Sequence, residues 1–249
     1  MSVEIIWLGS LASLLAGLAT GAGALPVLFT KKVSDKLLDV MLGFSAGVML
    51  AATFFSLIIP TIELSGVWVA VLGIVFGAVT LHLIDRSIPH FHPILGLEGP
   101  PSRLSGVWLF ALAITIHNFP EGLAVGVSFG IRDVAAGIVV ATAIGLQNMP
   151  EGLAVALPLF RDGYSRKRSL WYATLTGLVE PVGGLLGVGL ISVFHTILPW
   201  ALAFAAGAML FVVSDEIIPE SHRKGFEREA TFGLIIGFVI MMLLDCLFT

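Results

Sequence analysis

Charged residues are scarce in this 249-residue sequence, and cysteine is nearly absent. Asp, Glu, Lys and Arg make up 12% of the residues, compared with about 25% in an ordinary soluble domain. The single cysteine, Cys246, excludes an intrachain disulfide and any metal cluster built on several thiolates. The net charge of −4 comes without a long basic run, so no nucleic-acid partner is expected. Residues 1–7 contain Glu4 and no Lys or Arg, so no signal peptide is predicted there.

Apolar residues, in contrast, make up 57% of the sequence, too many for the polar surface of a soluble protein of this size to cover. A helix that crosses the hydrocarbon core of a bilayer needs about 20 mostly apolar residues. Eight stretches meet this requirement, at residues 4–29, 37–62, 67–84, 104–130, 134–159, 170–194, 200–218 and 230–247. We therefore predict an all-α, polytopic membrane protein with eight transmembrane helices, in which residues 1–249 form one domain within the lipid bilayer.

The positions of Lys and Arg predict the topology of these spans. Twelve of the thirteen fall in the loops after spans one, three, five and seven, and only Arg132 falls on the opposite side. The positive-inside rule makes these four loops cytoplasmic and places both termini outside a cell membrane. The longest of them, about residues 85–103, contains four prolines and is predicted to be irregular. Its two histidines, His90 and His92, are either metal-capturing groups or ordinary loop residues.

Two nearly identical polar blocks interrupt spans four and five. Residues 117–125 read His-Asn-Phe-Pro-Glu-Gly-Leu-Ala-Val, and residues 147–155 read Gln-Asn-Met-Pro-Glu-Gly-Leu-Ala-Val. Seven of the nine positions are identical. The first residue and the Glu of each block are four apart, so they share one helix face. Ionisable groups at this depth are costly and usually belong to a transport pathway. A single buried Glu could be protonated and merely structural, but a duplicated costly pattern is hard to explain by packing.

The prolines within the blocks add polar backbone to the same region. Pro120 and Pro150 cannot donate to the carbonyl groups of Ile116 and Leu146, which are thereby freed. Span six contributes Glu180, directly before a proline. Three carboxylates, an imidazole and several amides could therefore converge at mid-depth, where a divalent cation would offset the cost of burying them. Imidazole and carboxylate together make a good zinc site.

At these residues the sequence resembles the ZIP (Zrt/Irt-like) family of divalent metal transporters, in particular its prokaryotic branch. The resemblance covers the whole chain and is most specific at His-Asn-x-Pro-Glu-Gly in span four. It implies a zinc-type importer with spans one to three and six to eight as inverted repeats around spans four and five. The repeat itself is expected from the resemblance alone.

The resemblance also implies a set of metal ligands. His117, Glu121, Gln147, Glu151 and Glu180 would surround the metals. Asn118 and Asn148 would serve an adjoining second site, and Met49, in the segment 43–50, would offer a thioether. Many eukaryotic relatives have His where this sequence has Gln147, so cadmium, iron and manganese stay open as cargo beside zinc.

Other polar residues can be ordered along a route by the predicted topology. Ser56 and Glu63 lie on the outer half of span two. Glu216, Glu220 and His222 lie near the cytoplasmic end of span seven, where an ordinary solvated helix end is the alternative explanation. Asp245, near the outer surface, is given no role.

Three other functions compete with metal transport. An intramembrane zinc hydrolase is disfavoured because His-Glu-x-x-His is absent, and we predict that the protein is not an enzyme. A proton-coupled carrier of organic solutes also uses buried carboxylates, and a purely structural protein would not need them. We expect alternating access, and a homodimer is compatible with the sequence without being required by it.

Overall fold

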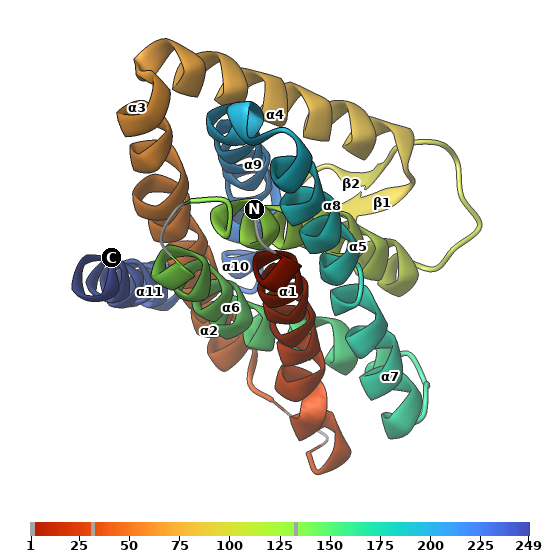
Figure 1. Ribbon diagram of the computed structural model, residues 1–249. Coiled ribbons are helices and arrows are strands. Elements are labelled where there is room, and N and C mark those ends of the chain that lie inside the picture. The colour runs from red at the N-terminus through yellow and green to blue at the C-terminus, as the bar shows by residue number, and fades with distance from the viewer. Residues whose placement is uncertain (1–2, 31–32, 132–133) are drawn as a thin grey trace.

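The computed structural model describes residues 3–30, 33–131 and 134–249. Lys31, Lys32 and Arg132, which contribute to the predicted topology, lie outside the described residues. Within the described ranges, eight helical segments are long and apolar enough to cross a membrane, which confirms the eight predicted spans (Figure 1). They are Val3–Leu28, Asp35–Ser65, Val67–Ser87, Gly106–Ser128, Val134–Arg161, Arg166–Val193, His195–Ser221 and Glu227–Phe248.

Four of the spans are single α-helices, and the other four are composite. The single helices are α4 (Val67–Ser87), α5 (Gly106–Ser128), α6 (Val134–Arg161) and α11 (Glu227–Phe248). Span one joins α1 (Val3–Ala24) to the 3-10 turn η1 (Leu25–Leu28), and span six joins α7 (Arg166–Gly177) to α8 (Glu180–Val193). Span two consists of α2 (Asp35–Ala51), the π-helix η2 (Ala52–Ile58) and α3 (Ile59–Ser65). Span seven consists of the 3-10 turn η3 (His195–Ile197), α9 (Leu198–Val212), the π-helix η4 (Val213–Ile217) and α10 (Ile218–Ser221).

Local sequence explains where several of these helices begin and end. The hydroxyl of Ser34 accepts a hydrogen bond from the backbone N–H of Leu37 and caps α2. Gly66 has a φ of +80°, which lets the chain reverse between spans two and three. Pro181 follows the start of α8, and a proline at this position suits the first turn of a new helix. Glu180 therefore lies at a helix start inside the membrane, not within one continuous helix.

The predicted irregular loop at residues 85–103 is partly wrong. Helix α4 continues to Ser87, and the loop then forms a short antiparallel hairpin of β1 (His90–His92) and β2 (Gly96–Glu98). Gly96, with a φ of +84°, adopts a backbone conformation that other residues rarely reach, and this closes the turn. Both loop histidines, His90 and His92, are buried in this hairpin against the helices.

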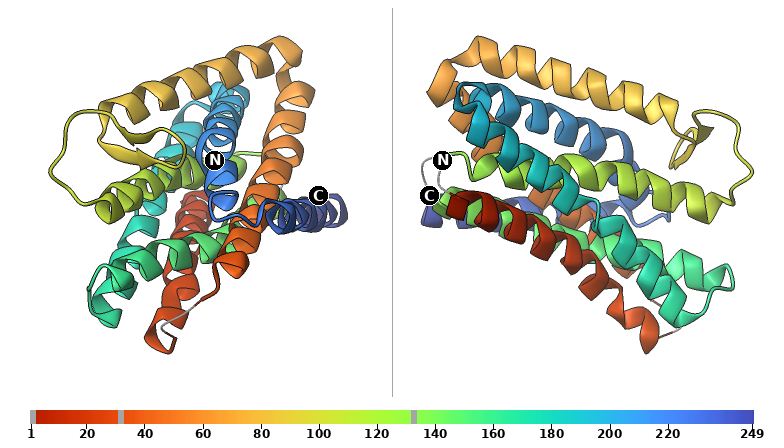
Figure 2. Two further views of the ribbon diagram at one scale, coloured as in Figure 1. Left: turned by 180° about the vertical axis from the view of Figure 1, so that it is seen from behind. Right: turned by 45° about the vertical axis from the view of Figure 1, so that its right-hand side comes forward.

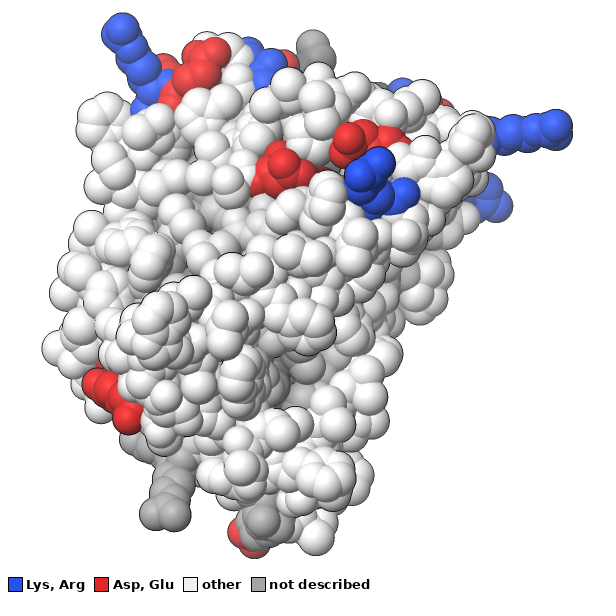
Figure 3. Space-filling model, turned by 90° about the horizontal axis from the view of Figure 1, so that it is seen from above, with Lys and Arg blue, Asp and Glu red and all other residues white. Residues whose placement is uncertain are grey.

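The two ends of the bundle differ clearly. Both termini lie at one end, which we call the termini end, and the β1–β2 hairpin lies at the opposite end, the loop end (Figure 2). On the face shown in Figure 3, Lys and Arg side chains gather towards one edge, with a broad uncharged band beside them. Such a band is what contact with lipid hydrocarbon requires.

An internal repeat relates spans one to three to spans six to eight, with a constant shift of 160 residues. Alanine, glycine and aspartate positions of α4 recur in α11, as in Gly73 and Gly233, Gly77 and Gly237, and Asp85 and Asp245. Met49 of α2 corresponds in the same way to Met209 of α9. Because the two halves are five spans apart, equivalent helices cross the membrane in opposite directions.

Close backbone contacts at glycines follow the same shift. Gly47 lies against the carbonyl oxygen of Leu234, and Gly207 against that of Ile74, too closely for either to carry a Cβ. Small residues of this kind let membrane helices approach each other. The inverted repeat that the resemblance implied is therefore present in the structure.

The same symmetry extends to the two central helices. Gly122 of α5 lies against the carbonyl oxygen of Glu180, and Gly152 of α6 lies against that of Thr20. The eight spans form two groups, one with α1, α5, α6, α7 and α8, and the other with α2, α3, α4, α9 and α11. The groups meet where α2 packs on α6 and α9 packs on α5, beside the two polar blocks.

Candidate metal centre

The seven polar residues predicted at the centre are all buried inside the membrane-spanning bundle. Both central helices continue through their internal prolines, Pro120 in α5 and Pro150 in α6. Each of the seven residues is at most 2% exposed. They are His117, Asn118, Glu121, Gln147, Asn148, Glu151 and Glu180.

Hydrogen bonds hold only part of this set in place. Ser45 of α2 donates to Glu151 Oε1 at 2.8 Å and also contacts the carbonyl oxygen of Gln147 at 3.1 Å. Asn148 Nδ2 donates to Glu180 Oε1 at 2.6 Å and to the carbonyl oxygen of Ala16 at 2.8 Å. The second block is thus fastened to spans one, two and six.

Many other ligand atoms of this set have no hydrogen-bond partner among the described residues. They include both side-chain polar atoms of Asn118, Glu121 and Gln147, together with one oxygen each of Glu151 and Glu180. A buried polar atom without a partner usually costs about 1–3 kcal/mol. A concentration of such atoms from carboxylate and amide groups fits a site for a divalent cation, which would satisfy several of them at once.

The three central carboxylates also act on one another electrostatically. Glu121 interacts with both Glu151 and Glu180, and Glu180 interacts with Glu151. Like charges brought together in a low-dielectric interior repel strongly. A cation among them would offset this repulsion, because it attracts all three carboxylates. The electrostatics and the unpartnered ligand atoms therefore both favour a cation site.

His117 does not turn only towards its own block. Its Nε2 lies 2.7 Å from Oε1 of Glu216, which belongs to the π-helix η4 of span seven. Glu216 is 4% exposed and so belongs to the buried site. Single-turn π-helical segments occur often at functional sites. The pair joins the centre to the loop end.

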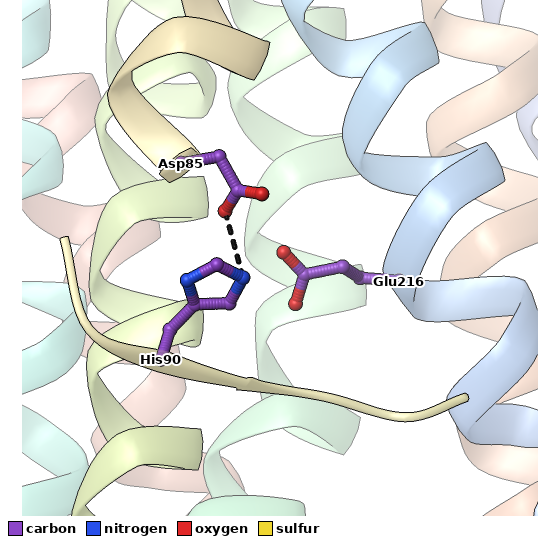
Figure 4. A group of neighbouring side chains, drawn as sticks. All are labelled: Asp85, His90 and Glu216. Carbon is purple, nitrogen blue, oxygen red and sulfur yellow. Dashed lines mark ion pairs between the residues drawn. The ribbon is translucent and has the colours of Figure 1, made fainter. Parts of the chain in front are cut away.

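Glu216 also belongs to a second cluster, which it forms with Asp85 and His90 (Figure 4). One ligand atom from each residue lies within 4.8 Å of the other two, and all three residues are buried. His90 Nε2 is 3.1 Å from Asp85 Oδ1. In Figure 4 the imidazole and the Glu216 carboxylate point towards each other. Two carboxylates and one imidazole are a suitable ligand set for zinc.

Two opposing effects act on the imidazole of His90, which lies in the loop outside the spans. Burial disfavours its charged form, but the carboxylate of Asp85 beside it, the carbonyl oxygen of Ile88 and the charge of Glu216 outweigh burial. Together they raise the pKa of His90 to about 9. A cation bound at this cluster would have to displace the proton.

His92, the other loop histidine, is held by backbone groups. Its Nδ1 accepts the N–H groups of Ile94 and Leu95 at 3.1 and 2.9 Å. Its Nε2 lies 3.5 Å from Asp215 Oδ2. His92 therefore fastens the hairpin to span seven and stands beside the cluster of Asp85, His90 and Glu216.

Two residues predicted on the cytoplasmic part of the route are engaged elsewhere. Both carboxylate oxygens of Glu220 pair with Arg223, at 2.7 and 2.9 Å. His222 is half-buried, and its Nδ1 lies 2.7 Å from the carbonyl oxygen of Ile218. The structure thus brings Glu216 to the site, but neither Glu220 nor His222.

At the termini end, the two predicted outer residues also differ from each other. Ser56 is buried, and its hydroxyl donates to Asp245 Oδ1 at 2.5 Å. Glu63 is exposed on α3. Asp245, to which no role was given, is only 8% exposed and contacts a predicted route residue.

Met49 is fully buried on α2, one turn after Ser45. Residues four apart share a helix face, so its side chain projects from the face that contacts the second block. Its service as a ligand stays a prediction.

A cavity of about 490 Å³ opens at the loop end between the two groups of helices. Its walls include Phe91 of the hairpin, Phe110 of α5 and Pro158 of α6. Leu38 of α2, Glu220 and Arg223 also line it. The cavity therefore follows the boundary between the groups.

Ser45, Asp85 and Asp245 are buried contact residues to which the sequence analysis gave no role. The 160-residue shift would have indicated the two aspartates, since Asp85 and Asp245 are equivalent positions on α4 and α11. Ser45 carries no comparable signal, because its equivalent position is Ala205.

Comparison with known proteins agrees with this architecture. Residues 96–245 match the family profile described as ZIP Zinc transporter. Zinc transporter GufA of Myxococcus xanthus is 49% identical over 247 residues, covering 95% of this chain and 97% of the relative. Zinc transporter ZIPB of Bordetella bronchiseptica is 46% identical over 237 residues, covering 91% and 77%. Human zinc transporter ZIP11 is 37% identical over 317 aligned positions, covering 91% and 93%. With this similarity along nearly its whole length, the chain belongs to the ZIP zinc transporter family.

Proposed function

We propose that this protein imports zinc through a site between α5 and α6 in the middle of the membrane. The observation that carries the proposal is the buried set of His, Asn, Gln and Glu side chains, many of whose ligand atoms lack hydrogen-bond partners among the described residues. The names of the relatives, all zinc transporters, support the choice of metal. Cadmium, iron and manganese are alternative cargo, since carboxylates and amides also suit harder or larger cations.

The proposed ligands divide into two adjoining groups. His117, Glu121, Gln147, Glu151 and Glu180, with Met49, form the first, and Asn118 and Asn148 extend it into a second. The two block glutamates would bridge the groups. The present bond of Asn148 to Glu180, at 2.6 Å, keeps two of these ligands beside each other.

The proposed orientation places the loop end in the cytoplasm and both termini outside, following the distribution of Lys and Arg. An inside-negative potential then favours inward movement of a divalent cation by about 4.6 kcal/mol per 100 mV. From the centre the cation would pass to Glu216, which contacts His117, and then to Asp85 and His90.

The flux of zinc into proteoliposomes that contain a zinc-sensitive dye tests this proposal. We expect wild-type protein to admit zinc and Glu151→Ala and His117→Ala to abolish the flux. Glu229→Ala is the matched control, because this half-buried acid forms an ion pair with Lys36 at the loop end, away from the centre, and should leave the flux intact. Folded wild-type protein that admits neither zinc nor cadmium would contradict the proposal.

The same vesicles separate transport from the rival functions. An intramembrane hydrolase would cleave added lipid or peptide without metal flux, whereas a proton-coupled solute carrier would bind no metal. We propose that neither activity is present. If the protein transports metal through this site, Glu121→Ala should abolish metal binding and metal flux together.

We further propose alternating access, in which the two groups of helices move against each other. A cross-link between the groups should stop the movement, and Arg161 of α6 lies 3.7 Å from Asp35 of α2 across their boundary. In a Cys246→Ser background, cysteines at 35 and 161 should therefore block zinc flux when cross-linked. Cysteines at 36 and 229 join α2 to α11 within one group, where the native pair is 2.8 Å apart, and should not. Equal flux from both cross-linked proteins would exclude this movement.

A further inference from the structure

The 160-residue shift of the inverted repeat relates the loop-end cluster to a pair of residues at the termini end. Asp85 of α4 corresponds to Asp245 of α11, and Glu216 of span seven corresponds to Ser56 of span two. The two members of the second pair, Glu216 and Ser56, both lie in π-helices, η4 and η2 respectively. Equivalent helices therefore bring equivalent positions together at the two ends, Asp85 with Glu216 at one end and Asp245 with Ser56 at the other.

The loop end carries strong metal ligands at these positions. Asp85 and Glu216 bring two carboxylates, and their ligand atoms lie within 4.8 Å of each other and of His90. Asp85 and Glu216 are 3% and 4% exposed. Two buried carboxylates side by side are unfavourable without a positive charge between them.

The equivalent pair at the termini end has one carboxylate, that of Asp245, and Ser56 brings a hydroxyl group to it. Ser56 donates to Asp245 Oδ1 at 2.5 Å, and the hydroxyl of Thr249 lies 3.3 Å from Oδ2. The Thr249 hydroxyl has one proton and lies closer, at 2.5 Å, to the backbone carbonyl oxygen of Asp245, so Ser56 is the main donor to this carboxylate. A single buried carboxylate with such a donor needs a cation less than two adjoining carboxylates do. A serine hydroxyl is also a much weaker ligand for zinc than a carboxylate or an imidazole.

We infer that the two ends are diverged copies of one divalent-cation site, and that Ser56, where the loop end has Glu216, gives the termini end its weak affinity. This inference rests on the proposed transport function. A cation would meet weak ligands where it enters and strong ligands where it leaves. The asymmetry changes the rates and the saturation at each face, whereas the final distribution of zinc depends only on the driving forces.

Replacing Ser56 by glutamate tests the inference, because Ser56→Glu restores the second carboxylate. We expect the zinc concentration that half-saturates uptake from the termini side to fall by at least about tenfold, the smaller of the usual effects of changes around a metal site. The maximum rate should fall as well, since a cation held more tightly leaves more slowly. Ser56→Gln, of similar size but uncharged, is the matched control and should not lower the half-saturating concentration.

A second measurement does not depend on transport. Zinc should raise the thermal unfolding midpoint of Ser56→Glu more than that of Ser56→Gln, because a ligand that binds only the folded state stabilises it. If wild-type protein shows no zinc flux, the proposed function fails, and this measurement still decides the inference. If Ser56→Glu does not fold, Ser56→Asp takes its place. Equal zinc stabilisation of the acidic and the Gln variants, or equal half-saturation in active transporters, would overturn the inference.

Discussion

The two polar blocks of α5 and α6 have nearly the same sequence but different surroundings. In the first block, His117 pairs with Glu216 of span seven, and Asn118 and Glu121 have no hydrogen-bond partner among the described residues. In the second block, Glu151 accepts the hydroxyl of Ser45, and Asn148 donates to Glu180.

The difference comes from the helices that pack on each block. Span two, which faces the second block, offers Ser45, whereas the equivalent position in span seven is Ala205. Span six packs on α5, but the side chain of its Glu180 reaches Asn148 of the second block. The equivalent position in span one, which packs on α6, is Thr20, which brings no carboxylate. A duplicated motif therefore specifies duplicated ligands, but the supporting residues make one block fastened and the other open.

Removing the glutamate of either block should have the largest effect, and the loss of zinc flux should be the same for the two blocks. We expect Glu121→Ala and Glu151→Ala each to lower zinc flux by about 100-fold or more, since loss of a direct ligand should exceed the 10–100-fold effect of the groups around it. Zinc uptake into proteoliposomes measures the loss. Substantial flux in either variant would show that only one block carries the metal.

Exchanging the first residue of each block should change metal preference. Gln147→His adds a nitrogen ligand, which zinc favours over manganese, and we expect the zinc-to-manganese flux ratio to rise by about tenfold, the lower end of the range for changes around a metal site. His117→Gln should lower the ratio by a similar factor. Competition between the two metals in the same vesicles measures it. An unchanged ratio in both variants would show that these positions do not select the metal.

The two asparagines should differ in their effect on stability. Asn148→Ala removes hydrogen bonds to Glu180 and to the carbonyl oxygen of Ala16, so we expect it to cost about 1–3 kcal/mol of unfolding free energy. Asn118→Ala removes no such bond among the described residues and should cost less. Unfolding in detergent, without added metal, measures both. A greater loss for Asn118→Ala would reverse the assignment of the fastened and open blocks.

The smallest effects should come from the supporting residues of spans two and seven. Ser45→Ala should cost about 1 kcal/mol, the usual net value of a hydrogen bond, and Ala205→Ser should offer Glu121 a similar donor. The pair would make the two blocks more alike. Metal-free thermal unfolding should show opposite shifts for the two variants. Shifts of the same sign would mean that Ala205 does not face the first block as Ser45 faces the second.

Much of the fold and the centre could be predicted from the sequence because the signals are local. Span length, the distribution of Lys and Arg, and the four-residue spacing within each block all act inside one helix or at its ends. The π-helices were not predicted, since they depend on contacts with other spans. The break before Glu180 and the loop hairpin were not predicted either, although Pro181 and Gly96 are local signals for them. The repeat was expected from the family resemblance alone, although the shift from Asp85 to Asp245 is present in the sequence.

The sequence by itself determined that the chain crosses a membrane eight times and carries two costly polar blocks at mid-depth. Only the tertiary structure decided that Glu216 meets His117, 99 residues away, and also meets Asp85 and His90. The physical reason is that helix periodicity sets the face on which a side chain lies, but not the height at which two helices meet. That height is set by close backbone contacts between spans, such as Gly122 against Glu180 and Gly207 against Ile74.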